Sequence, residues 1–251
     1  MRKRLEIGRK VQMRQTYTDL FIDFDDTLYD THGNATIALG ELFDEFRLGE
    51  RFDDVCTFRD AYWKTNVALW AQYSRGEISR DYLILERFRR PLSLGQHDDP
   101  SWPDADYCGR MSDRFLELCS AKPGVVEGAR ELMDYLRAKG YRMHICSNGF
   151  HEVQYKKLKA CGLYHYFDTI ILSEDAGANK PSKQFFDHAF RVSGAPRERT
   201  LMIGDNYNTD IEGAMNAGLD TLFFKRWDKA FEPPRPVTYE VETLREIMEV
   251  L

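Results

Sequence analysis

The chain of 251 residues has no long apolar run; its apolar stretches are short, such as Leu20–Ile22 and Ile170–Leu172. A helix that crosses a membrane needs about 20 consecutive apolar residues, so the sequence predicts no membrane span. An apolar stretch is also missing after the basic start of the chain, where a secretory signal peptide would carry one. We therefore interpret residues 1–17 as a basic N-terminal tail, or as an upstream start before Met13.

Cysteine is scarce and shows no pairing pattern. There are five cysteines, no two of which form a CxxC pair, and the six histidines show no metal-ligand spacing. The sequence therefore predicts neither a zinc site nor a dithiol redox motif. An odd number of scattered cysteines is typical of a reduced protein, and we expect a cytoplasmic one. The cysteines are Cys56, Cys108, Cys119, Cys146 and Cys161.

A basic surface is missing too, since the formal net charge is −6. Nucleic acid polymers bind to basic faces, so we expect no such partner. A small anionic substrate is compatible with this charge, because a buried site can be locally positive. No Walker A sequence and no GxGxxG is present, so a nucleotide-type glycine loop does not hold a phosphate here.

What the chain does contain, from Pro123 onward, is a regular alternation of apolar strands and amphipathic helices. Each of these helices stops at a glycine, as at Gly140 and Gly162. Alternating strands and helices predict right-handed βαβ units and a parallel sheet. An earlier apolar segment, residues 19–24, is expected to join the same sheet. The later strands are expected at Tyr141–Cys146, Thr169–Leu172, Thr200–Ile203 and Thr221–Phe224.

Helical segments rich in aromatic residues separate the first strand from the others. Phe58–Tyr73 and Ile78–Phe88 have helical spacing, and Pro91–Pro103 is expected to be a loop. We therefore predict an α/β fold: a doubly wound, Rossmann-like parallel sheet core from residues 18–32 and 119–251, with an α-helical cap domain inserted at 33–118. The aromatic residues at helical spacing in the cap are more often core residues than a base-stacking platform. They include Tyr62, Trp63 and Trp70.

Polar residues follow four of the expected strands. In open parallel sheets, ligands bind beyond the carboxyl ends of the strands, which all lie at one edge. Taken singly, each of these residues also has an ordinary structural explanation, such as a helix cap, a turn or a surface lysine. Because polar residues follow four of the expected strands in order, a shared site is favoured over these separate explanations. Its candidates are Asp23, Asp25 and Thr27, then Ser147 and Asn148, then Lys180, then Asp205 with Asp210.

The charge pattern at this edge points to a metal and a phosphate. Clustered carboxylates resist ionising together, and a divalent cation removes that problem. Mg²⁺ commonly takes one or two protein carboxylates and completes its shell with water and substrate phosphate. Lysine and small hydroxyl side chains are suitable partners for the phosphate oxygens.

At this point the sequence resembles a known family. Asp23–Leu28, Ser147–Phe150, Lys180-Pro181 and Gly204–Asp210 resemble the four ordered motifs of the haloacid dehalogenase (HAD) superfamily. The resemblance covers residues from about 18 to the end, and the insertion resembles the subfamily with a helical cap. Residues 149–168, including Gln154 and Lys157, and residues 76–79 are similar to the pyrimidine 5′-nucleotidase branch; we interpret these positions as largely structural.

The resemblance implies a role for each candidate. Asp23 would attack the phosphorus and form an aspartyl-phosphate, and Asp25 would act as general acid and then general base. Mg²⁺ would be held by Asp23, Asp205 and the backbone carbonyl of Asp25. Asp210 would support the metal site or the lysine from outside the ligand shell. The phosphoryl oxygens would be held by Thr27, Ser147, Asn148 (mainly through its backbone amide) and Lys180.

We therefore expect a Mg²⁺-dependent phosphomonoester hydrolase that acts on a small molecule, with a pyrimidine nucleoside 5′-monophosphate as the expected substrate. A sugar-phosphate phosphatase or phosphomutase of the same superfamily is the alternative among enzymes. A dehalogenase fits less well, because Asp25 supplies an acid/base that only a phosphatase needs. A non-catalytic phosphate-binding module is the alternative from another class, although the complete set of acidic candidates and Lys180 is present. The sequence does not indicate the oligomeric state.

Overall fold

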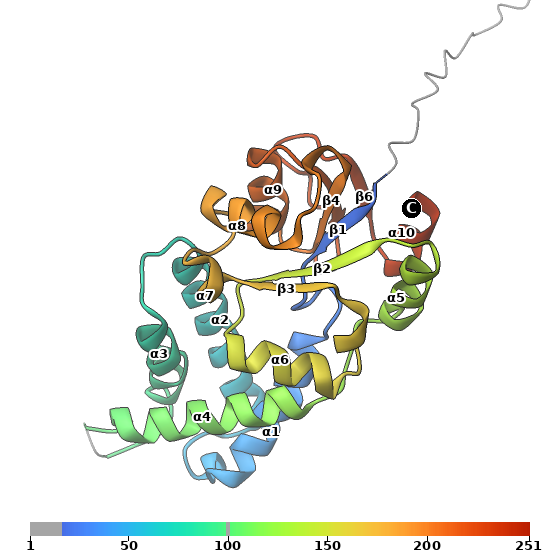
Figure 1. Cartoon of the computed structure of the whole chain (residues 1–251). Coiled ribbons are helices and arrows are strands. Elements are labelled where there is room, and N and C mark those ends of the chain that lie inside the picture. The colour runs from blue at the N-terminus through green and yellow to red at the C-terminus, as the bar shows by residue number, and fades with distance from the viewer. Residues whose placement is uncertain (1–16, 99–100) are drawn as a thin grey trace, which may run out of the picture.

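The computed structural model describes residues 17–98 and 101–251. At its centre lies one sheet of six parallel strands in the order β3-β2-β1-β4-β5-β6 (Figure 1). The expected doubly wound α/β fold is thereby confirmed, with β1 in the middle of the sheet. The strands are β1 (Asp19–Ile22), β2 (Arg142–Ser147), β3 (Thr169–Leu172), β4 (Thr200–Gly204), β5 (Asp220–Phe224) and β6 (Tyr239–Val241).

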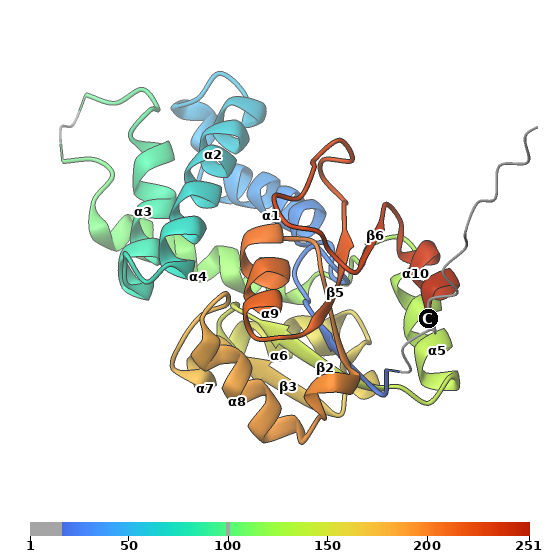
Figure 2. The same ribbon diagram turned by 90° about the horizontal axis from the view of Figure 1, so that it is seen from above.

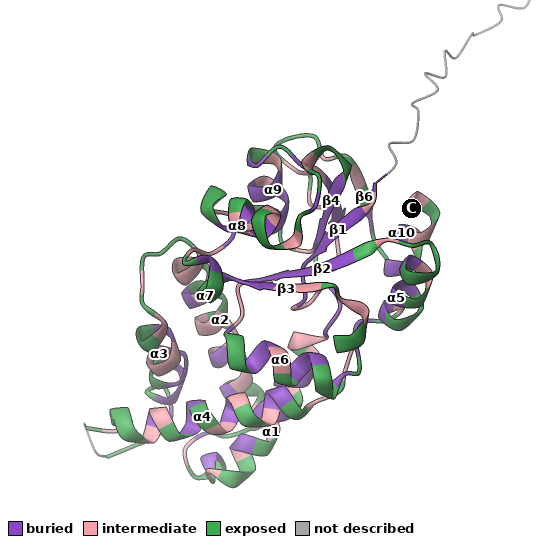
Figure 3. Ribbon diagram, viewed as in Figure 1, coloured by how far each residue is buried: buried purple, intermediate pink, exposed green. Residues whose placement is uncertain are grey.

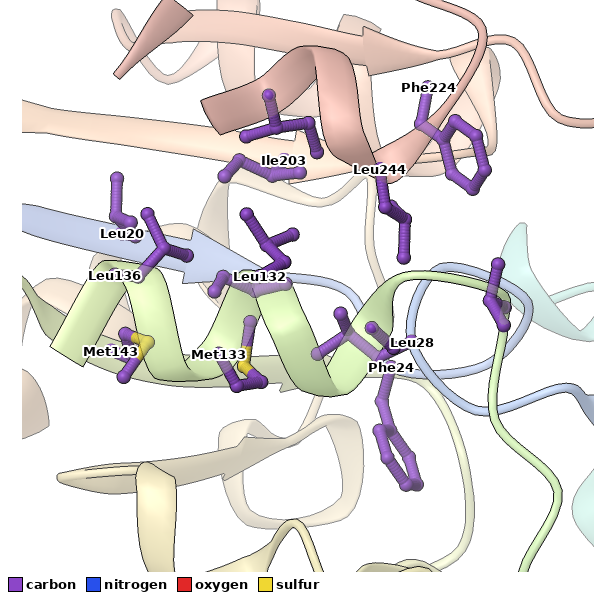
Figure 4. Packing of buried hydrophobic residues seen from close by; sticks show 14 of the residues in the cluster. Leu20, Phe24, Leu28, Leu132, Met133, Leu136, Met143, Ile203, Phe224 and Leu244 are labelled. Carbon is purple, nitrogen blue, oxygen red and sulfur yellow. The ribbon is translucent and has the colours of Figure 1, made fainter. Parts of the chain in front are cut away.

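Helices cover both faces of the sheet, and most residues of the central strands are therefore buried (Figure 3). On one face, Leu20 of β1 and Ile203 of β4 pack with Leu132 of α5 in the largest apolar cluster (Figure 4). On the other face, Phe21 and Met202 pack under α8 and α9. Successive strand residues thus point to opposite faces. The helices are α5 (Ala129–Ala138), α6 (His151–Ala160) and α10 (Leu244–Val250) on the first face, and α8 (Lys183–Ser193) and α9 (Glu212–Asn216) on the second.

Four helices between β1 and α5 form a separate layer beside the sheet (Figure 2). They share their own buried cluster, which includes Leu39, Phe58, Phe88 and Phe115. Each begins at an aspartate or serine whose side chain accepts from a backbone N–H three residues on, an arrangement that satisfies a free donor of the first turn. The helices are α1 (Thr31–Glu45), α2 (Val55–Ser74), α3 (Arg80–Leu92) and α4 (Ala105–Ala121).

Several boundaries differ from those expected. The helix α3 continues through Pro91 to Leu92, into the segment that was expected to be a loop. The helices α1 and α4 extend across residues 33 and 118, so the division into core and cap domains remains a prediction. Tyr17, which we placed in the tail, is buried and donates a hydrogen bond to Asp220 (2.8 Å). The rest of that tail, residues 1–16, lies outside the described residues.

The helix ends of the α/β part agree with the sequence prediction. All four glycines expected to stop the helices of the α/β part have positive φ, between 64° and 81°, a conformation that glycine adopts without steric cost. The glycines are Gly140, Gly162, Gly194 and Gly218.

Among residues 17–98 and 101–251, no helix is both long enough and apolar enough to cross a membrane.

Candidate active site

A cavity of about 1030 Å³ lies between the carboxyl edge of the sheet and the helical layer. Residues that follow β1, β2 and β4 line one part of it, and residues of α2, α3 and α4 line the other. The cavity thus joins the polar edge predicted from the sequence to an aromatic wall. Lining residues include Asp23, Asp25, Ser147, Asn148, Lys180, Asp205 and Asp210 on the sheet side, and Tyr62, Trp63, Trp70, Arg87 and Phe115 on the helical side.

Lys180 connects two of the predicted acidic residues. Its Nζ donates to Asp23 Oδ1 (2.7 Å), to Asp210 Oδ1 (2.7 Å) and to the carbonyl oxygen of Cys146 (2.6 Å). Burial lowers the pKa of this ammonium, but Asp210 and Asp23 outweigh that effect and raise the pKa overall. Lys180 is therefore a buried permanent cation that fixes the carboxylate of Asp23.

Thr27 contacts the carboxylates of Asp23 and Asp205 from a fully buried position. Its hydroxyl lies 3.0 Å from Asp23 Oδ2 and 3.2 Å from Asp205 Oδ1, and it accepts from the backbone N–H of Asp205 (3.1 Å). Thr27 is fully buried and is not among the residues that line the cavity. Its position therefore favours the orientation of Asp23 and Asp205 over the direct phosphate contact that we predicted.

Three carboxylates meet at this point with one lysine between them. Asp23, Asp205 and Asp210 each offer an oxygen, and the three atoms lie within 4.8 Å of one another. Burial raises the pKa of Asp23 to about 7; Lys180 opposes this shift, and the charge of Asp210 adds to it. Burial and the neighbouring Asp23 and Asp210 also raise the pKa of Asp205. The cluster therefore carries surplus negative charge and oxygen donors, which suit a hard divalent cation such as Mg²⁺.

The three aspartates differ in their suitability as direct ligands. Both oxygens of Asp210 are engaged, one by Lys180 and the other by the backbone N–H of Asn206 (3.1 Å). Asp210 is also fully buried, whereas Asp205 is partly exposed. Both oxygens of Asp23 and of Asp205 also accept hydrogen bonds, so the greater exposure of Asp205 is what distinguishes it, and Asp210 holds the lysine in place.

Asp25 is held by three side chains on its cavity side. Thr31 Oγ1 (2.6 Å) and Lys157 Nζ (2.6 Å) both donate to Oδ1, and Gln154 Nε2 (2.5 Å) donates to Oδ2. Burial opposes the ionisation of Asp25, but Lys157 and the other donors outweigh it and lower the pKa of the carboxyl. The sequence predictions treat Gln154 and Lys157 as largely structural positions. Their i, i+3 spacing on the helix after Ser147 places them on one face, and this signal could have linked them to Asp25.

Ser147 and Asn148 lie at the end of β2. The Ser147 hydroxyl accepts from the backbone N–H of Gly149 (3.0 Å) and from Gln154 Nε2 (2.6 Å). The Asn148 side chain accepts from the backbone N–H of Lys180 (2.8 Å) and donates to its carbonyl oxygen (3.0 Å). The side chain of Asn148 thus anchors the loop that carries Lys180, which is compatible with the predicted use of its backbone amide.

The sequence predictions do not include a tryptophan that contacts one of the carboxylates. The indole Nε1 of Trp227, in the loop after β5, donates to Asp205 Oδ2 (2.9 Å). His32 stacks on Trp63 of α2, with 4.2 Å between ring centroids, and also contacts Trp227. These rings connect the sheet side with the helical side of the cavity. The strand-end rule, extended to the fifth expected strand, Thr221–Phe224, indicates Trp227.

The substitution Lys180→Met should destabilise the fold. It would leave Asp23 and Asp210 buried together without their cation, and removal of one partner of a buried ion pair typically costs about 3–5 kcal/mol. Urea denaturation in the presence of a chelator measures the change in the free energy of unfolding. The control is Lys183→Met, which removes an exposed i, i+4 pair with Asp187 and should leave the stability nearly unchanged. Equal stabilities of the two variants would contradict the expectation.

Known proteins resemble this chain over most of its length. The family model described as haloacid dehalogenase-like hydrolase matches residues 20–218. The pyrimidine 5′-nucleotidase PynA of Streptococcus pneumoniae is 30% identical over 237 residues, which cover 94% of this chain and 95% of that protein. The glyceraldehyde 3-phosphate phosphatase of Methanothermobacter thermautotrophicus is 40% identical over 207 residues, which cover 81% of this chain and 83% of that protein.

A solved structure resembles most of this chain. It is that of the HAD-hydrolase YfnB of Bacillus subtilis bound to magnesium, with a TM-score of 0.81 and 28% sequence identity. The match covers 94% of this chain and 98% of that one. The similarity therefore includes the helical layer as well as the sheet.

Proposed function

The chain belongs to the haloacid dehalogenase-like hydrolases, and from this premise we propose that it is a Mg²⁺-dependent phosphomonoester hydrolase with Asp23 as the nucleophile. One observation carries the proposal. The Asp23 carboxylate lies on the cavity wall with its two oxygens fixed by Lys180 and Thr27, beside Asp205. A carboxylate fixed in this way is preorganised for attack on a phosphorus atom, and phosphoryl transfer depends mainly on positioning and charge.

The reaction would proceed in two halves. In the first, an oxygen of Asp23 bonds to phosphorus, the bond from phosphorus to the alcohol oxygen breaks, and Asp25 gives that oxygen a proton. In the second, Asp25 takes a proton from water, the water oxygen bonds to phosphorus, and Asp23 is released with inorganic phosphate. Asp25 thus enters the first half protonated and the second half ionised, and the pairing with Lys157 favours the ionised form.

The magnesium site is part of the proposal. Asp23, Asp205 and the backbone carbonyl of Asp25 would hold Mg²⁺, and Asp210 would keep Lys180 in place. Bound Mg²⁺ would neutralise charge on the phosphoryl group and the nucleophile. The surplus of negative charge in the carboxylate cluster supports this assignment, as does the magnesium in the YfnB structure.

For the substrate, we propose a pyrimidine nucleoside 5′-monophosphate. The alignment with PynA covers 94% of this chain and thus extends over the helical layer, which supplies the wall opposite the carboxylates. The cavity, at about 1030 Å³, is slightly larger than the range of roughly 300–1,000 Å³ that is typical of ligand pockets. This volume leaves room for a base beside the phosphate, between side chains such as Tyr62, Trp63 and Trp70.

A panel of phosphomonoesters tests the function. With Mg²⁺ present, kcat/KM for UMP and dTMP should exceed that for ribose 5-phosphate and glyceraldehyde 3-phosphate by more than about tenfold, or about 1.4 kcal/mol. Excess chelator should remove the activity and Mg²⁺ restore it. Ca²⁺ should inhibit, because it prefers more ligands and longer bonds.

The outcomes separate the alternatives. Equal or better turnover of a sugar phosphate would refute the nucleotidase assignment and leave the phosphatase intact. Full activity in excess chelator would refute the metal site. No turnover of any phosphomonoester would favour a phosphate-binding module.

A further inference from the structure

Arg87 of α3 is a buried cation without a carboxylate partner among the residues that the structure describes. The whole residue is 2% exposed. Its Nε (3.1 Å) and Nη2 (2.6 Å) both donate to the Ser112 hydroxyl of α4, and the guanidinium lies 5.2 Å from the ring centroid of Phe115. The neighbouring Arg89 and Arg90 are different, because both pair with Glu86.

A buried cation without a counter-charge destabilises the fold, so its presence suggests a function. Burial lowers the pKa of the Arg87 guanidinium, yet arginine stays protonated in proteins, so the fold carries an uncompensated charge. Arg87 lines the same cavity as Asp23 and Lys180. The contacts of Arg87 with Ser112 use its Nε and Nη2. Within residues 17–98 and 101–251, its third nitrogen, Nη1, makes no side-chain hydrogen bond. The guanidinium therefore has a donor left for a group inside the cavity.

The surroundings of Arg87 indicate what that group is. Tyr62 packs against both Phe88 and Phe115, with centroid distances of 5.2 and 5.3 Å, and it lines the cavity with Trp63. Aromatic walls suit a flat ring of low polarity, whereas a second phosphate or a carboxylate would lose its hydration there. A planar ring that bears a hydrogen-bond acceptor fits both features. Uracil and thymine carry two ring carbonyls, cytosine carries one, and adenine carries none.

On the basis of the proposed function, we propose that Arg87 is the residue that recognises the base: its free guanidinium edge donates to a ring carbonyl oxygen of the pyrimidine. Ser112 orients the guanidinium, and Tyr62 and Trp63 border the ring. A buried donor that is left unpaired disfavours a competing substrate more strongly than a lost apolar contact does. Arg87 would thus set the preference for pyrimidines over adenine nucleotides.

The substitution Arg87→Met separates recognition from packing, since methionine fills a similar length of the helical core without the donor. We expect kcat/KM for UMP to fall about 10- to 100-fold, and kcat/KM for p-nitrophenyl phosphate to fall much less. The ratio of kcat/KM for UMP to kcat/KM for AMP should fall as well. The control Arg90→Met lies on the same helix, pairs with Glu86 and is not among the cavity residues. It should change neither value. Equal losses on UMP and p-nitrophenyl phosphate would overturn the assignment in favour of a packing role.

A second measurement uses the wild-type protein and does not depend on the folding of a variant. A thiocarbonyl is a weaker acceptor than a carbonyl, so kcat/KM should fall at least about fivefold for either 2-thiouridine or 4-thiouridine 5′-monophosphate relative to UMP. Full activity on both analogues would overturn the assignment. If the wild type does not prefer UMP to ribose 5-phosphate, the nucleotidase proposal fails and this inference fails with it. A preference that persists unchanged in Arg87→Met overturns this inference alone.

Discussion

The substitution Asp23→Asn should abolish turnover, with a fall in kcat of at least about 10⁴-fold. Asparagine keeps the shape of the side chain, and its carbonyl oxygen still accepts a hydrogen bond from Lys180. The neutral amide is a poor nucleophile, however, and it cannot form an acyl phosphate. Because Lys180 retains its ion pair with Asp210, the fold should persist. Phosphate release from saturating UMP with Mg²⁺, on freshly purified protein, measures the effect.

The matched control for Asp23→Asn is Asp30→Asn, seven residues further along the chain. Asp30 is the N-cap of α1 and is not among the residues that line the cavity. Asparagine caps helices as well as aspartate does, so this variant should keep most of its activity. Acid quenching with labelled substrate should leave the phosphoryl group on the wild-type protein and not on Asp23→Asn. Wild-type turnover by Asp23→Asn would falsify the covalent mechanism.

The carboxylate site could be predicted because its signals are local. Each strand is a short apolar run, and parallel strands place the residues after them at one edge. The register confirms this for β1, where Ile22 pairs with Ile145 of β2 on one side and with Ile203 of β4 on the other. The residues that follow these strands therefore meet, although more than a hundred residues separate Asp23 from Lys180 along the chain.

The contacts that depend on tertiary packing could not be predicted. Nothing in the sequence around α3 distinguishes Arg87 from Arg89 and Arg90, and only the packing of α3 on α4 buries the first and leaves the others paired with Glu86. Thr27 has the residue type of a phosphate ligand, but the turn after β1 places its hydroxyl behind Asp23. The strand β6 has three residues, which is too short for a periodic pattern.

The substitution Asp25→Asn should affect the two halves of the reaction differently. A general acid–base residue typically contributes about 10²–10⁴-fold, and kcat/KM for UMP should fall by that order, because the nucleoside oxygen needs a proton to leave. Nitrophenolate leaves without one, so kcat/KM for p-nitrophenyl phosphate should fall much less. This ratio reports only the steps up to departure of the leaving group, and stopped assays with both substrates measure it.

The second half of the reaction gives Asp25→Asn a further signature. Water must still be activated to release the phosphoryl group from Asp23, and asparagine cannot accept the proton. With p-nitrophenyl phosphate, the variant should therefore release a burst of about one nitrophenol per enzyme and then turn over slowly, while the phosphorylated protein accumulates. The amide oxygen of asparagine can still accept from Thr31 and Lys157. Gln154 can turn its unpaired carbonyl oxygen toward the new NH2 group, so the variant should fold. Equal losses on both substrates without a burst would mean that Asp25 neither protonates the leaving group nor activates water, and that its ion pair with Lys157 is structural.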